Sequence, residues 1–197
     1  RFRLGPEQTD GIMIGAVHTI PTERGNGFAP ALLGWVEDLE ISRQATLSML
    51  FTDIGTEYYA RLGYRECPSW EVRVATADLE ACWQLERVDA RENAEQLRRW
   101  YENSTRTDVL ALVRDQNYWD YVFNKQPEDL TFLAEDEHGE PAGYIRVRCR
   151  ESGWTIQDWG LAEQADENLT AITLALAAQA EQEGCSLLGG WMPRWST

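Results

Sequence analysis

A glycine-containing turn between a strand-like and a helix-like segment constrains the fold of this chain more than any other sequence feature. Residues 12–17 form an apolar run that predicts a β-strand, and the run ends before Pro21. The hexapeptide Arg24-Gly25-Asn26-Gly27-Phe28-Ala29 comes next. Over residues 29–40, apolar side chains then recur at helical spacing and predict one buried stripe, made by Ala29, Leu32, Leu33 and Val36.

Such a turn is suited to binding a phosphate. The first turn of a helix has unpaired backbone N–H groups and the positive end of the helix dipole, and glycine lets a ligand approach the backbone. Arg24 adds a positive charge beside it. Two glycines alone fit a plain turn equally well, so the choice between the two interpretations depends on the residues after the predicted helix.

A second strand and a short helix come after the predicted helix. Residues 45–51 are apolar and predict a strand, and residues 52–55 then open a short helix that carries Tyr58 and Tyr59 and ends at Gly63. The order of strand, turn, helix and strand predicts two parallel strands joined by a helical crossover.

These motifs resemble those of the GNAT superfamily of acetyl-CoA-dependent N-acetyltransferases. Residues 24–29 match its Arg/Gln-x-x-Gly-x-Gly/Ala signature, and Tyr59-Ala60-Arg61-Leu62-Gly63-Tyr64 is similar to its second signature, a tyrosine four residues before Gly-aromatic. Residues 18–23 and 50–55 look most like a branch that includes fungal lysine acetyltransferases and related two-domain enzymes. The resemblance covers about the first seventy residues.

The resemblance implies an α/β (α+β) fold with a mixed sheet flanked by helices. It implies an enzyme that transfers the acetyl group of acetyl-CoA to a primary amine, either a small molecule or a lysine-like acceptor. The backbone of Val17, His18 and Thr19 would pair with the pantetheine arm. The amides of Arg24, Gly25, Asn26, Gly27, Phe28 and Ala29 would hold the pyrophosphate.

Tyr59 would be the general acid that protonates the CoA thiolate, whereas Tyr58 points elsewhere on the helix and is expected to pack. The general base stays open among Glu23, Asp53 and His18, and water or a chain terminus is a further alternative. Thr52 and Gly55 depart from the Asn and Ala that the family often has before the tyrosine helix.

A complete GNAT domain has further helices and strands before the cofactor turn, and residues 1–10 are too few to form them. We therefore expect residues 1–78 to be the C-terminal portion of a GNAT domain whose N-terminal part is missing here. Residues 79–197 are expected to form a second α+β domain, either a degenerate GNAT-like copy or an unrelated one. Because Leu161–Glu167 is acidic and lacks the glycine signature, we expect no cofactor in this half.

The second half contains patterns for several elements. Strands are expected at 70–75, 130–134, 142–150 and 154–161, with a charged turn around His138 between the second and third. Helices are expected at 89–103, 108–114 and 117–124. A further helix, capped by Asn168, should extend to about Gln182, end at Gly184 and be followed by a last strand from Ser186. Aromatic side chains of this half or residues 191–197 are candidates to line an acceptor cleft.

Composition restricts the classes of partner. The chain has 18 Lys and Arg against 33 Asp and Glu, a net charge of −15, which argues against nucleic acid and anionic membranes and weakly favours a cationic amine. No transmembrane run is evident. The four cysteines (Cys67, Cys82, Cys149, Cys185) form no C-x-x-C pair, and the only histidines are His18 and His138. We therefore expect a cytoplasmic protein without a metal.

The main alternative function is a non-catalytic acyl-CoA-binding or regulatory GNAT-like module. A dinucleotide-binding oxidoreductase is set aside because Gly25–Pro30 lacks the third glycine of G-x-G-x-x-G. The nine tryptophans also permit a sugar-binding module, but they are dispersed and fit strand and helix cores better. The sequence leaves open which amine is acetylated and which oligomer the chain forms.

Overall fold

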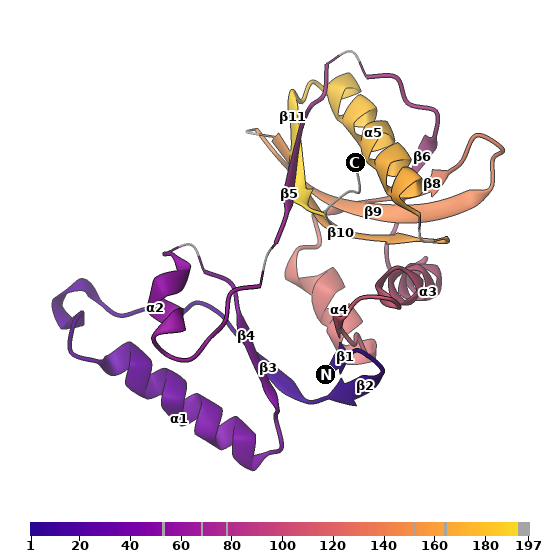
Figure 1. Cartoon of the computed structure of the whole chain (residues 1–197). Helices are drawn as coiled ribbons and strands as arrows, with labels where there is room; N and C mark the ends of the chain where they lie inside the picture. The colour runs from indigo at the N-terminus through magenta and orange to yellow at the C-terminus, as the bar shows by residue number, and fades with distance from the viewer. Residues whose placement is uncertain (53, 68, 78, 152, 164, 193–197) are drawn as a thin grey trace. The chain divides into compact units, whose positions relative to one another are not determined.

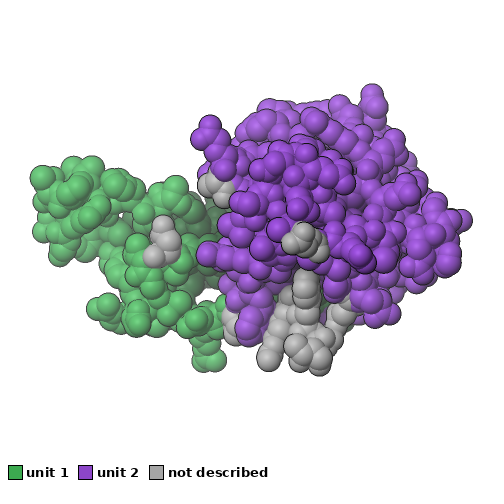
Figure 2. Space-filling view, turned by 90° about the horizontal axis from the view of Figure 1, so that it is seen from above, with its two compact units in different colours: residues 1–68, 108–114 green, residues 69–107, 115–197 purple. Residues whose placement is uncertain are grey.

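The computed structural model describes residues 1–52, 54–67, 69–77, 79–151, 153–163 and 165–192. The chain divides into two compact units, which are described separately (Figure 2). Unit 1 comprises Arg1–Pro68 and Asp108–Arg114, and unit 2 comprises Ser69–Thr107 and Asp115–Thr197.

Unit 1 is built around two parallel strands joined by a helix (Figure 1). Its elements are β1 (Phe2–Leu4), β2 (Glu7–Thr9), β3 (Gly11–Ile14), the 3-10 turn η1 (Pro21–Glu23), α1 (Phe28–Ser42), β4 (Leu47–Leu50), α2 (Thr56–Ala60) and β7 (Leu110–Leu112). Strands β3 and β4 pair from Gly11 opposite Leu47 to Ile14 opposite Leu50, and α1 connects them. The predicted strand–helix–strand crossover is confirmed.

Close packing in unit 1 depends on Gly11. A Cβ at this position would lie 2.6 Å from the carbonyl oxygen of Leu47 and 2.9 Å from the ring of Phe2, which is itself buried. On α1, Leu33 is the buried residue, whereas Leu32 is 54% exposed. The prediction that Leu32 belongs to the buried stripe is therefore wrong, because the helix is rotated so that the face of Leu33 points inward.

Two sequence predictions in unit 1 need correction. The first strand ends at Ile14, not Val17, and Ala16 has a positive φ of 55°, a conformation that interrupts a strand. Residues 108–114 contain the strand β7 and no helix. The segment pairs antiparallel with β1, from Leu4 opposite Leu110 to Phe2 opposite Leu112, and this non-local pairing overrides the local helical pattern.

Unit 2 contains a six-stranded mixed sheet in the order β5-β11-β10-β9-β8-β6. Its elements are β5 (Glu71–Ala75), β6 (Gln84–Val88), α3 (Ala94–Thr105), α4 (Gln116–Lys125), β8 (Leu130–Glu135), β9 (Pro141–Arg150), β10 (Gly153–Leu161), α5 (Asp166–Gln182) and β11 (Leu187–Trp191). Only β10 and β11 pair in parallel among the described strands of this sheet, from Trp154 opposite Leu188 to Ile156 opposite Gly190, and the other pairs are antiparallel.

Helices cover both faces of this sheet (Figure 1). The alternation along β9 sends Ile145 and Val147 into the apolar cluster with α5. Tyr144 instead joins the cluster of α3 and α4 on the opposite face. Helix α3 approaches β10 closely at Gly160, where a Cβ would lie 2.8 Å from the α3 backbone.

Most elements of the second half were predicted correctly, with shifted ends. The strands β5, β8, β9, β10 and β11 and the helices α4 and α5 are confirmed. The predicted helix at 89–103 begins only at Ala94, and the preceding strand β6 was missed. Helix α5 begins at Asp166 with Ala165 as its N-cap, so Asn168 does not cap it; its side-chain amide donates to the Glu163 carbonyl instead (3.3 Å).

Candidate functional site

The predicted anion-binding turn lies directly before α1. Gly25 and Gly27 both have left-handed backbones, with φ of 87° and 79°, and Gly27 is the N-cap of the helix. A side chain at either position would strain the backbone. The first backbone bond into the helix runs from the N–H of Ala31 to the carbonyl of Gly27 (3.1 Å).

The amides of this turn are available to a ligand. Within the described part of the chain, the N–H groups of residues 25–29 have no hydrogen-bond acceptor, residues 24–27 are exposed or partly exposed, and the first turn of α1 contains no acidic residue. Unpaired amides at the positive end of a 15-residue helix attract an anion. We call residues 24–29 the anion nest.

Two side-chain hydrogen bonds stabilise the conformation of the nest. The Nε of Arg24 donates to the carbonyl of Thr19 (3.1 Å), and the side-chain amide of Asn26 donates to the carboxylate of Glu23 (3.1 Å). Arg24 therefore keeps its charge next to the nest while it ties the loop after β3 to the start of α1. Glu23 adds a negative charge nearby, which weakens the attraction of the nest for an anion.

The nest and the helix of Tyr59 lie at the same edge of the β3–β4 pair (Figure 1). The chain leaves the carboxyl end of β3 toward the nest and the carboxyl end of β4 toward α2. Because the strands are parallel, both carboxyl ends lie at one edge. This edge is where ligands bind in open α/β sheets.

Tyr59 is held in a small aromatic group and is only 9% exposed. Its ring packs edge-on against Tyr58 (centroids 5.0 Å apart) and Tyr64 (5.9 Å). Its carbonyl accepts the N–H of Tyr64 (3.1 Å) and that of Leu62 (2.9 Å), and Gly63 has a φ of 95°, as expected for a helix-terminating glycine.

Several other predicted site residues lie in the loop between β3 and α1. Val17, His18 and Thr19 lie in the loop after β3, which ends at Ile14, and not in a strand. The carbonyl of Thr19 already accepts from Arg24. His18 lies in this loop without burial, and Glu23 is bound by Asn26. Asp53 lies outside the described residues.

Sequence reasoning missed one polar network in unit 1. The hydroxyl of Tyr64 donates to the carboxylate of Glu37 and hydrogen-bonds to the hydroxyl of Ser48 (2.6 Å). Desolvation and the hydrogen bond to Glu37 together raise the pKa of Tyr64 to about 12. Glu37 lies four residues after buried Leu33, so a carboxylate on the buried helix face was the available signal.

The described residues contain no group of three or more His, Cys, Asp or Glu side chains placed to hold a metal ion. None of the helices in this part of the chain has the length and apolar character that a bilayer crossing requires.

Comparison with solved structures identifies the fold. A GCN5-related N-acetyltransferase from Kribbella flavida is 16% identical (TM-score 0.68), and the match covers 93% of this chain and 45% of that one. A probable N-acyltransferase of unknown function from Enterococcus faecalis V583 is 18% identical (TM-score 0.66), with 91% and 46% covered. A tandem GNAT protein from the clavulanic acid biosynthesis pathway is 13% identical (TM-score 0.57), with 98% and 69% covered.

The chain has the GNAT fold, a mixed sheet flanked by helices. It spans less than half the length of the Kribbella flavida and Enterococcus faecalis proteins. No protein-family model matches the sequence, and no curated protein matches it significantly.

Proposed function

We propose that the protein is an N-acetyltransferase that transfers the acetyl group of acetyl-CoA to a primary amine. The observation that carries the proposal is the anion nest, whose unpaired amides and left-handed glycines fit a pyrophosphate at the start of α1. The solved GNAT structures support the same class of reaction.

Acetyl-CoA supplies a reactive thioester, so the protein mainly has to position it and manage protons. The amine nitrogen attacks the thioester carbonyl, the C–N bond forms and the C–S bond breaks. The amine loses a proton to a base, for which His18, Glu23 and Asp53 are the candidates, with water or a chain terminus as a further alternative. Tyr59 donates its phenolic proton to the departing thiolate.

The environment of Tyr59 supports this assignment. Its ring is held between those of Tyr58 and Tyr64, on the helix that follows β4 at the same edge of the β3–β4 pair as the nest. Arg24 and the nest would hold the pyrophosphate, and backbone groups of residues 17–19 would contact the pantetheine arm from the loop. The acceptor is a small amine or a lysine-like side chain, favoured by the net charge of −15.

Unit 2 is proposed to be a second GNAT-like unit that binds no cofactor. Its parallel β10–β11 pair with the intervening α5 repeats the arrangement of β3, α1 and β4 in unit 1. The N-terminus of α5 differs from that of α1, because its N-cap is Ala165 in an extended conformation and Glu167 lies in its first turn. The negative charge of Glu167 would repel a pyrophosphate. We place the protein in the cytoplasm.

Calorimetric titration with acetyl-CoA and CoA tests the binding step. The parent should bind both ligands, and the Arg24→Glu, Gly27→Glu double variant should bind neither. Arg43→Glu, which changes an exposed charge at the other end of α1, is the matched control and should bind like the parent. Failure of the folded parent to bind would refute the proposed site.

Turnover then separates an enzyme from a non-catalytic acyl-CoA-binding module. Thiol release from acetyl-CoA is measured with a panel of small amines and free lysine. Tyr59→Phe should lower kcat roughly 10²–10⁴-fold with CoA affinity retained, because general acid catalysis contributes about this much, whereas Tyr58→Phe should leave kcat near the parent value. Binding without turnover for any amine would favour the non-catalytic module.

A further inference from the structure

Unit 2 contains a cavity of about 280 Å³ that the proposed acetyl transfer does not use. It lies between the turn after β6 and the segment that joins α4 to β8. Among its lining residues are three arginines and three carboxylates: Arg87, Arg91, Arg146, Asp89, Glu128 and Asp129. We call this cavity the arginine pocket. Its volume is near the lower end for small-molecule sites, so it would suit a compact metabolite.

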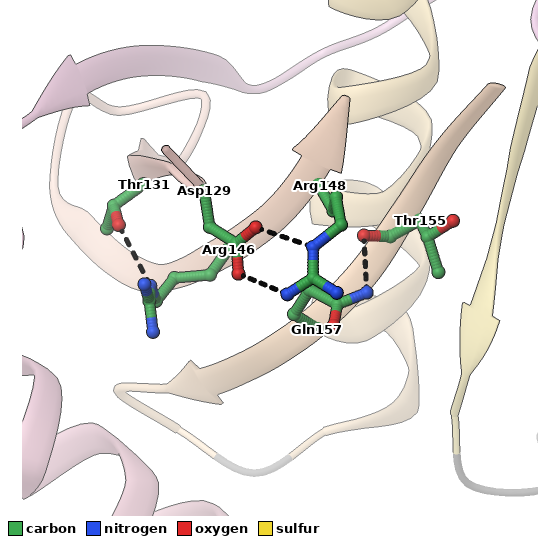
Figure 3. A network of polar contacts seen from close by, with 6 residues as sticks. All are labelled: Asp129, Thr131, Arg146, Arg148, Thr155 and Gln157. Carbon is green, nitrogen blue, oxygen red and sulfur yellow. Dashed lines mark hydrogen bonds and ion pairs between the residues drawn. The ribbon is translucent and has the colours of Figure 1, made fainter. Parts of the chain in front are cut away.

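The cation at the inner side of the pocket is Arg146, which is only 3% exposed. Its Nε donates to the hydroxyl of Thr131 (3.2 Å), the residue opposite it on β8 (Figure 3). Its guanidinium lies over the ring of Phe123, 5.4 Å from the centroid. A guanidinium stays protonated when buried, so Arg146 brings a permanent positive charge into a weakly solvated site.

Two of the three carboxylates at the pocket, Asp129 and Asp89, accept hydrogen bonds within the protein. Both oxygens of Asp129 accept from Arg148, at 2.9 and 3.0 Å (Figure 3). One oxygen of Asp89 accepts the backbone N–H of Arg91 (2.7 Å). Asp129 is therefore neutralised by Arg148, and Asp89 is partly satisfied by the turn that it stabilises.

The two arginines at the rim of the pocket, Arg91 and Arg87, differ in their hydrogen bonding. Arg91 donates from Nη2 to the side-chain oxygen of Asn124 (2.6 Å), which fixes its position at the rim. Arg87 is exposed and makes no hydrogen bond or ion pair to any residue that the structure describes. Its guanidinium can therefore bind a ligand without breaking a contact within the protein.

We propose that the arginine pocket binds a small metabolite through a compact oxyanion group, a carboxylate or a phosphate. Arg146 holds the charge from the inner side, and Arg87 and Arg91 bind it from the rim. Guanidinium groups match the planar oxygen pairs of both anions and form strong charge-assisted hydrogen bonds with them. Since the whole chain carries a net charge of −15, long-range attraction would not bring an anion here, so affinity must come from these local contacts.

The test is calorimetric titration of the protein with orthophosphate and, separately, with succinate, in a buffer free of both and at fixed ionic strength. The parent should bind at least one of them, and the one that binds identifies the source of the oxyanion. Arg87→Glu should weaken binding at least about tenfold, the effect of losing one charge-assisted hydrogen bond. Arg150→Glu is the matched control, because it reverses an exposed charge on β9 outside the pocket.

Arg146→Met removes the inner charge and should abolish binding. Its folding is checked by circular dichroism, and because Arg87 is exposed, Arg87→Glu tests the pocket even if Arg146→Met does not fold. The proposal is overturned if the folded parent binds neither anion, or if Arg150→Glu weakens binding as much as Arg87→Glu does. Because all these residues belong to unit 2, the outcome is independent of acetyl-CoA binding at the nest in unit 1.

Discussion

The hydrogen-bond network of Tyr64 predicts a pH-dependent contribution to the stability of unit 1. Tyr64→Phe removes a hydroxyl that donates to the Glu37 carboxylate and is also bonded to Ser48. A hydrogen bond to a charged group contributes about 1.5–3 kcal/mol when buried, and Tyr64 is only partly buried. We therefore expect Tyr64→Phe to lower the free energy of unfolding by about 1–2 kcal/mol at pH 8.

The sign of the pH dependence is set by the raised pKa. The pKa of Tyr64 rises from 10.0 to about 12 in the folded protein, chiefly through desolvation and then through the bond to Glu37. Between these two values the unfolded state has lost the phenolic proton and the folded state still holds it. Stability from this group is therefore complete below pH 10 and is lost as the pH rises toward 12.

The expected loss at pH 11 can be worked out. If the whole pKa shift from 10.0 to about 12 acted on stability, the protein would lose about 1.4 kcal/mol of folding free energy at pH 11. Tyr64 is partly exposed, and solvent screening reduces this loss to about 0.7 kcal/mol. The difference in stability between the parent and Tyr64→Phe should therefore shrink by about 0.7 kcal/mol from pH 8 to pH 11.

The assay is urea unfolding followed by circular dichroism at both pH values, with Tyr121→Phe as the control. Tyr121 is 49% exposed, so its variant should track the parent at both pH values. A gap between the parent and Tyr64→Phe that stays constant with pH would refute the assignment of the raised pKa. Equal stability of the two at pH 8 would refute the contribution of the hydrogen bond itself.

Three further predictions concern packing and charge, each measured by urea unfolding. Asp129→Asn should lower the free energy of unfolding by about 2–3 kcal/mol, because it weakens the two hydrogen bonds to Arg148 at a side chain that is 4% exposed. The control Glu137→Gln, on the exposed turn, should lower it by less than about 0.5 kcal/mol. Gly160→Ala should lower the free energy of unfolding by about 2–3 kcal/mol, because its Cβ would lie 2.5 Å from the Tyr144 ring and 2.8 Å from the α3 backbone. Gly34→Ala lies within α1 with no atom near the added Cβ, so it should instead raise the free energy of unfolding by about 0.5–1 kcal/mol. Leu33→Ala should cost about 2–4 kcal/mol and Leu32→Ala less than about 1 kcal/mol, and equal costs would contradict the observed rotation of α1.

Local patterns were enough to predict the crossover of unit 1 and most strands of unit 2. The glycine turn is recognisable because Gly25 and Gly27 adopt left-handed backbones that few other residues tolerate. The long helix α5 is recognisable from its Ala- and Leu-rich composition. Both signals depend on residues close together in sequence, and both were predicted with ends accurate to a few residues.

Contacts between distant residues explain what the sequence did not reveal. Strand β7 pairs with β1, about a hundred residues earlier, so its local pattern was ambiguous between helix and strand. The same holds for the arginine pocket, whose residues come from β6, α4, β8 and β9 and share no motif. The partners of Tyr64 also come from two other elements, α1 and β4, although the tyrosine itself belongs to a recognisable signature.

The two helices that connect a strand to a parallel partner, α1 and α5, have different N-termini although their connections are similar. Each crosses from one strand to a parallel neighbour, so each presents an amino-terminal turn at the carboxyl edge of its sheet. Before α1, two left-handed glycines turn unpaired amides outward, and the first turn contains no acidic residue. Before α5, the N-cap is an extended alanine, and the first turn contains Glu167, whose charge already complements the dipole. A carboxylate in the first turn stabilises the helix but opposes an external phosphate, so anion affinity and helix stabilisation compete for the same amides. This competition is the physical reason for proposing an anion site at α1 and none at α5.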